Sequence, residues 1–153
     1  MVSQNQYERV QSYIRKGIEE GAEVLVGGAG HPPGFEAGYF VKPTIFVNVK
    51  NNMTIAQEEI FGPVLCVITY DSEDEAIRIA NDSKYGLHSA VLGTDLKRAR
   101  HVASQIRAGR VVINGMTDDP QAPWGGFKYS GFGREYGQYG AEAFLETRAI
   151  LES

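Results

Sequence analysis

Apolar strand-like segments alternate regularly with helix-like segments in the middle of this 153-residue chain. Residues 64–70, 87–92 and 110–113 are apolar runs of strand character. Between them, residues 72–82 and 95–106 place apolar side chains at helical spacing. Strand, helix, strand, helix and strand in succession are typical of βαβ units, which build a parallel sheet with both faces covered. The sequence therefore predicts an α/β fold.

Helix starts are marked at two places. Ser3 with Gln6 fits a capping box, which predicts a first helix that ends near Gly21. Ser72 with Glu75 repeats the pattern at the start of the helix expected over 72–82. Strands are expected at 22–26 and 43–49, with a glycine- and proline-rich loop at 27–38 between them. A further short segment is expected at 54–59.

The last forty residues change in character. Residues 114–140 contain seven glycines, two prolines and six aromatic residues without sustained periodicity, and such a long loop is usually functional or packed against another part. Its stretches at 125–131 and 131–137 lack the GxxxxGK[ST] and GxGxxG spacings of phosphate-binding loops, so we interpret these glycines as backbone geometry. Residues 141–145 predict a short helix and 147–151 a final strand.

Composition excludes several classes of protein. The formal net charge is −4 and no run of Lys and Arg exists, so a nucleic-acid partner is not expected. No apolar stretch approaches the roughly 20 residues that a membrane helix needs, and the first residues do not resemble a signal peptide. The single cysteine, Cys66, cannot form an internal disulfide, which favours a reducing cytoplasm.

A metal site and a pair of catalytic acids are not predicted. His31, His88 and His101 lie far apart in the sequence and have no second ligand at zinc-binding spacing, so packing or surface roles are expected. Adjacent side chains such as Asp118 and Asp119 usually diverge. A solvated turn is the better interpretation of this pair.

Cys66 is interpreted as an apolar residue of the core. It lies in the middle of the strand expected at 64–70, and the nearest charge on its N-terminal side is Glu59. A nucleophilic cysteine requires exposure and surroundings that lower its pKa. A cysteine within an apolar strand acts far more often as a small packing residue.

Several segments, in order, resemble signatures of the aldehyde dehydrogenase superfamily. The most specific is QEEIFGPV at 57–64, which is similar to the EEIFGPV signature of that family. The other segments that resemble family signatures are GYFVKPT at 38–44, NDSKYGL at 81–87, VING at 112–115, APWGGFKYSGFGRE at 122–135 and FLETRAI at 144–150. The resemblance implies that residues 1–153 are the C-terminal portion of the αβα catalytic domain, incomplete, with about 146–153 as a strand of the oligomerisation region.

The resemblance also implies an activity for the parent protein. That family oxidises an aldehyde to a carboxylate with NAD or NADP, using a cysteine nucleophile and a glutamate base, and a homo-oligomer is expected. The chain contains neither a G-Q-x-C nor an E-L-G-G segment, and Cys66 follows the FGPV signature instead of preceding it. We therefore expect no catalytic residue, weak or no cofactor binding, and no activity of this chain alone.

Three residues take roles from the resemblance. Glu59 is similar in position to the glutamate that holds the hydroxyls of the nicotinamide ribose, and Phe61 to the aromatic that contacts the nicotinamide. Trp124 stands where the family usually has Phe, beside the substrate tunnel, so it is expected either to line an apolar passage for the aldehyde tail or to serve in packing. Asn114 receives no catalytic role, and residues 115–123 are where substrate preference is expected to be determined.

The sequence leaves two alternatives open. The chain could be a non-catalytic oligomerisation or interaction module of the same fold, because exposed sheet edges and apolar patches favour association. It could also be part of a relative that acylates CoA or reduces an acyl phosphate. Sequence upstream of Met1 would decide between this relative and an aldehyde dehydrogenase.

Overall fold

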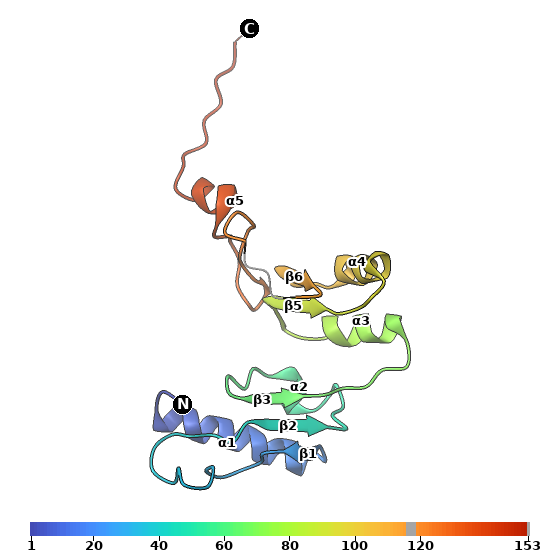
Figure 1. Ribbon diagram of the computed structural model, residues 1–153. Coiled ribbons are helices and arrows are strands. Elements are labelled where there is room, and N and C mark those ends of the chain that lie inside the picture. Colours follow the sequence, from blue (N-terminus) through green and yellow to red (C-terminus); the bar gives the residue numbers. More distant parts are fainter. Residues whose placement is uncertain (116–118, 153) are drawn as a thin grey trace. The chain divides into compact units, whose positions relative to one another are not determined.

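The computed structural model describes residues 1–115 and 119–152, and the chain divides into two compact units, Met1–Asp71 and Ser72–Ser153. Figure 1 shows the helices and strands of each unit. Both units combine helices with short strands, which confirms the predicted α/β class.

The first unit begins with helix α1 (Gln4–Glu19). The Ser3 hydroxyl accepts a hydrogen bond from the Gln6 backbone N–H at 3.3 Å, so the helix starts at the predicted cap. Val10 and Ile14 lie one turn apart and are both fully buried. This face of α1 therefore anchors the helix to the core of the unit.

A three-stranded sheet completes this unit, in the order β1 (Glu23–Val26), β2 (Thr44–Val47) and β3 (Val64–Cys66). β1 pairs with β2 in antiparallel fashion, whereas β3 pairs with β2 in parallel fashion. The short helix α2 (Thr54–Gln57) lies between β2 and β3 in the sequence. The buried cluster that joins these elements contains Val10, Ile14, Ala22, Val41, Phe46, Val49, Met53, Ile55 and Ile60.

The second unit contains a parallel strand pair. Strand β5 (His88–Val91), helix α4 (Leu96–Gln105) and strand β6 (Arg110–Ile113) follow one another, and β5 and β6 pair in parallel. Their register begins with His88 opposite Arg110. The arrangement is the βαβ unit that the alternating pattern predicts.

Helix caps in this unit also follow the sequence. Helix α3 (Glu73–Asn81) begins after Ser72, whose hydroxyl accepts a hydrogen bond from the Glu75 N–H at 3.2 Å. Asp95 caps α4 by accepting from two backbone N–H groups of its first turn. Each cap satisfies N–H groups that a helix cannot pair internally.

The glycine-rich loop at 114–140 returns to the residues that precede β5. Strand β7 (Phe127–Lys128) pairs antiparallel with strand β4 (Tyr85–Gly86). Helix α5 (Gly137–Glu142) follows, and residues 143–152 then extend away from it (Figure 1).

The structure corrects several details of the predicted parallel sheet. The described strands form three small sheets, and two of the four strand pairs are antiparallel. β3 ends at Cys66 instead of Tyr70, α5 begins at Gly137 instead of residue 141, and no strand forms over 147–151. A strand exists only where a neighbouring backbone supplies hydrogen-bond partners, and strand-like side chains alone do not supply them.

Candidate functional site

The turn after α2 presents two of the predicted site residues to solvent. Glu59 is exposed, and the Phe61 side chain is 72% exposed. Ile60 between them is buried at 7% and belongs to the core cluster. Burial of Ile60 therefore fixes the turn to the unit while its two neighbours remain outside.

The backbone of this turn is unusual at Phe61, which has a φ of +57°. Residues with a Cβ rarely adopt this left-handed region, which costs of order 1 kcal/mol or more. The next residue, Gly62, lies so close to α1 that an added Cβ would be 2.6 Å from a methyl group of Val10. The local shape thus depends on close packing against α1.

One face of α1 holds the turn through hydrogen bonds. Gln6 donates its side-chain amide to the Phe61 carbonyl oxygen at 2.8 Å, and Arg9 donates to the Glu59 carbonyl oxygen at 3.0 Å. The Tyr13 hydroxyl donates to the Glu58 carboxylate at 2.8 Å. Arg9 also donates to the Tyr13 hydroxyl at 3.3 Å and lies 5.3 Å from the centre of its ring.

Gln6, Arg9 and Tyr13 were not identified from the sequence as site residues. They recur at intervals of three and four residues, so they line one stripe of α1 beside the buried stripe that contains Val10 and Ile14. That polar stripe is the only sequence signal that could have indicated them. Nothing in the sequence shows that its partners lie 45 to 55 positions away.

The chemistry of this turn fits the nicotinamide cofactor that the resemblance implies. A carboxylate such as Glu59 can accept hydrogen bonds from two neighbouring hydroxyls of a ribose. Phe61 offers a flat apolar face two residues away. Because α1 holds the turn through backbone carbonyls and the Glu58 carboxylate, the side chains of Glu59 and Phe61 remain available for a ligand.

Cys66 occupies the end of β3 and is half-buried against the core of the first unit. Its Sγ donates to the Ile55 carbonyl oxygen at 3.5 Å. Burial raises the pKa of the Cys66 thiol, so the protonated form prevails at neutral pH. Cys66 packs against the core as predicted, but it is half-buried at the end of the strand instead of buried in its middle, and its surroundings do not lower the pKa of the thiol.

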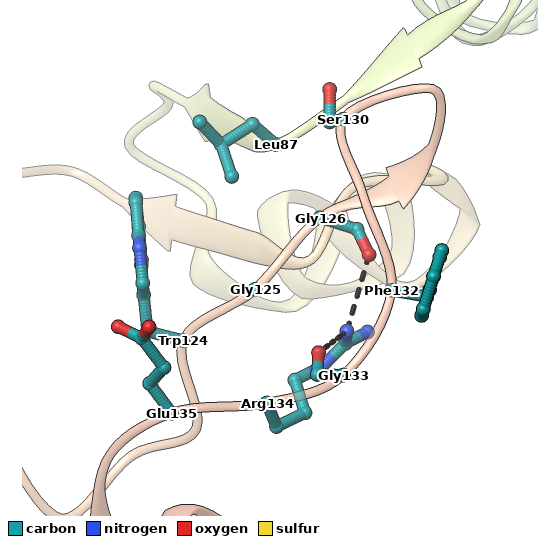
Figure 2. A pocket seen from close by; sticks show the side chains of 9 residues that line it. All are labelled: Leu87, Trp124, Gly125, Gly126, Ser130, Phe132, Gly133, Arg134 and Glu135. Atoms are coloured by element: carbon teal, nitrogen blue, oxygen red, sulfur yellow. Dashed lines mark hydrogen bonds between the residues drawn. The ribbon is translucent and has the colours of Figure 1, made fainter.

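Trp124 lies in the second unit and lines a hollow of about 330 Å³. Figure 2 shows the side chains around this hollow. Trp124 and Glu135 exchange two backbone hydrogen bonds, of 2.9 and 2.7 Å. Arg134 donates to the carbonyl oxygen atoms of Gly126 and Gly133, so its guanidinium fixes the loop that forms the hollow (Figure 2).

The glycine-rich loop is fixed by structural contacts, in agreement with its interpretation as backbone geometry. The Lys128 ammonium donates to the carbonyl oxygens of Asn81 and Ser83, at 2.8 and 2.9 Å, near the end of α3. A Cβ on Gly109 would lie 1.6 Å from the Gly125 carbonyl oxygen, so only glycine permits this approach. The two hydrogen bonds from Lys128 thus satisfy carbonyl oxygens at the end of α3, where a positive charge is favourable.

The remaining sequence candidates have structural roles. Asn114 exchanges hydrogen bonds with the backbone of Gly93, both at 2.7 Å. Asp119 accepts from the Gln121 N–H in a tight turn, whereas Asp118 lies outside the described residues. Among residues 1–115 and 119–152, no group of three or more His, Cys, Asp or Glu side chains could hold a metal ion, and no helix is long and apolar enough to span a membrane.

Comparisons with known proteins agree with the signatures. The model of the aldehyde dehydrogenase family matches residues 1–150. A Staphylococcus haemolyticus protein, named provisionally as an aldehyde dehydrogenase, is 58% identical over 150 residues, which are 98% of this chain and 32% of that protein. The chain thus spans about a third of the length of the curated relatives it matches.

Solved structures give the same result. A mutant of aldehyde dehydrogenase C of Pseudomonas syringae, complexed with NAD+ and octanal, matches with a TM-score of 0.95 and 53% identity over 98% of this chain and 31% of its own. A Mycobacterium tuberculosis aldehyde dehydrogenase complexed with NAD+ matches with a TM-score of 0.91 and 53% identity, over 94% of this chain and 30% of its own. The chain belongs to the aldehyde dehydrogenase family.

The hydroxyl of Tyr13 is predicted to order the turn that presents Glu59 and Phe61. In Tyr13→Phe, we expect the backbone order parameters of residues 59–61 to fall from about 0.85 towards 0.6, because a tether to the turn is lost. Nitrogen-15 relaxation measures this change.

Tyr7→Phe is the matched control, because the Tyr7 hydroxyl lies on the same helix but contacts His31 at 3.1 Å. This variant should loosen the loop around residue 31 and leave residues 59–61 unchanged. Equal loosening of the turn in both variants would contradict a specific role for Tyr13.

Cys66 is predicted to react slowly with iodoacetamide at pH 7 to 8, relative to the same chain in denaturant. Its raised pKa keeps the proton on the folded thiol at pH values where the unfolded thiol releases it. Stability should accordingly fall as pH rises above about 8.5, the ordinary pKa of an unfolded cysteine thiol, because the folded state then binds more protons than the unfolded state. Equal alkylation rates of folded and unfolded chains at pH 7 would refute the buried-thiol assignment.

Proposed function

We propose that this chain is a segment of the catalytic domain of an NAD- or NADP-dependent aldehyde dehydrogenase, which oxidises an aldehyde to a carboxylic acid. The observation that supports this most is the turn at residues 58–61, where an exposed carboxylate and an exposed aromatic ring are held by α1. Relatives of 53% identity have been solved with NAD+, one of them also with octanal. A medium-length aliphatic aldehyde is therefore a reasonable first substrate to test.

In this proposal the two units contribute different surfaces. Glu59 accepts hydrogen bonds from the hydroxyls of the nicotinamide ribose, and Phe61 restricts movement of the nicotinamide ring. Trp124 forms a wall beside the aldehyde tail. When bound, the nicotinamide supplies the acceptor for the hydride that leaves the substrate.

In this function the chain contributes no reacting group. Cys66 is a poor nucleophile because burial raises its pKa, and its Sγ is engaged with a backbone carbonyl. The motifs around the family's nucleophile and base do not occur in the sequence. We therefore propose that the 153-residue chain binds the cofactor weakly and does not turn over substrate. Lack of disulfides is consistent with function in a reducing cytoplasm.

Two measurements on the purified chain test the proposal. Saturation-transfer NMR with millimolar NAD+ should show contacts to the nicotinamide and its ribose, and Glu59→Gln should weaken them severalfold because a charged acceptor is lost. Glu19→Gln, which removes an exposed carboxylate of α1, is the matched control. The absence of any NAD+ contact in the unmodified chain would remove the support that the turn gives.

An assay for aldehyde-dependent formation of NADH or NADPH completes the test. With octanal as substrate, we expect no turnover above the background without protein. Clear turnover that disappears in Cys66→Ala would show that the chain is itself an enzyme with Cys66 as nucleophile.

A second function is favoured by the C-terminal tail. Phe144, Ile150 and Leu151 are 91%, 75% and 92% exposed, and residues 146–152 have strand-like character but no strand partner within the described residues. We propose that this tail joins copies of the chain through backbone pairing, as in β-strand addition. Light scattering should show oligomers that removal of residues 146–153 converts to monomers, whereas a strictly monomeric full chain at high concentration would exclude this role.

A further inference from the structure

The indole of Trp124 is contacted by two side chains from the parallel strand pair. The guanidinium carbon of Arg110 lies 4.7 Å from the centre of the indole, within the range of a cation–π contact. The His88 ring lies 6.2 Å away, tilted by 45°. His88 and Arg110 are direct register partners at the start of β5 and β6, so two adjacent strands together supply the contacts of the Trp124 indole.

The main chain of Trp124 is fixed separately from its side chain. The two backbone hydrogen bonds with Glu135 set the position of the residue, but they leave rotation about the side-chain bonds open. Contact with Arg110 restricts that rotation. Trp124 lines the hollow in Figure 2, whereas Arg110 is not one of its lining residues. The guanidinium therefore supports the ring without occupying the hollow.

We propose that Arg110 is a positioning residue, which holds the Trp124 indole in one orientation as a rigid wall of this hollow. The consequence for substrate choice rests on the proposed function. A fixed flat wall admits slim, unbranched aldehyde tails and disfavours bulky ones, whereas a mobile indole discriminates less. Arg110 thus determines specificity through Trp124 and does not touch the substrate.

The chain offers a direct readout, because Trp124 is its single tryptophan. In Arg110→Gln without any ligand, we expect the fluorescence emission to shift to longer wavelength. The acrylamide quenching constant should rise roughly two- to fivefold, the population change expected when a cation–π contact is lost. Arg110→Lys keeps the charge without the planar group and should give an intermediate result.

Arg107→Gln is the matched control, since it removes an exposed arginine three positions earlier in the same unit. Its emission and quenching should equal those of the unmodified chain. If Arg110→Gln retains its circular dichroism and also matches the unmodified chain in fluorescence, the positioning role is refuted.

A measurement on the unmodified chain covers the case in which Arg110→Gln does not fold. Protons on the Arg110 side chain should show upfield NMR shifts, because they lie over the face of an aromatic ring. Shifts typical of an extended, solvated arginine would overturn the proposal without any variant.

Titration with octanal then separates this inference from the proposed function. Saturable quenching of Trp124 supports the hollow as an aldehyde site, and weaker discrimination between octanal and a branched aldehyde is expected in Arg110→Gln. If octanal leaves Trp124 unaffected while the ligand-free results hold, the substrate role of the hollow fails and the positioning of the indole by Arg110 stands. If octanal binds but the unmodified chain and Arg110→Gln discriminate equally between octanal and the branched aldehyde, the specificity role of Arg110 is overturned.

Discussion

Two stripes of helix α1 hold the first unit together. Its apolar stripe buries Val10 and Ile14 completely in the core, and apolar burial of this kind is the dominant favourable contribution to folding. Its polar stripe, which includes Arg9 and Tyr13, is thereby held within hydrogen-bond distance of the turn at 58–61. Hydrophobic packing therefore determines where the hydrogen-bond donors stand, and the donors determine where the exposed carboxylate and ring of the turn are presented.

In the second unit, hydrogen bonds of one residue, Asn81, hold the glycine-rich loop in place. Asn81, the last residue of α3, donates to the Gln105 carbonyl oxygen and accepts from the Arg107 N–H, while its own carbonyl accepts from Lys128. One residue thus connects two helix ends and the glycine-rich loop. This loop carries Trp124, so polar contacts at helix ends help to hold the loop that forms the hollow.

Local signals in the sequence were sufficient for the fold class and for most element positions, because caps and periodicity act over a few residues. The caps at Ser3 and Ser72 are correct, and so is the parallel pairing of β5 with β6. The sequence did not predict where strands end or how they join into sheets, since these depend on distant backbone partners. The same limit applies to the site. Family signatures indicated Glu59 and Phe61, whereas Tyr13 became visible only when its partner, Glu58, was placed beside it.

The left-handed backbone at Phe61 has a consequence for how this family member can change. A glycine would adopt that φ of +57° without strain, and the exposed ring contributes little burial in return. Selection for stability alone would favour replacing the phenylalanine. Its presence indicates a trade-off in which folding free energy is sacrificed for a surface feature, so selection for heat resistance alone would favour variants without this ring.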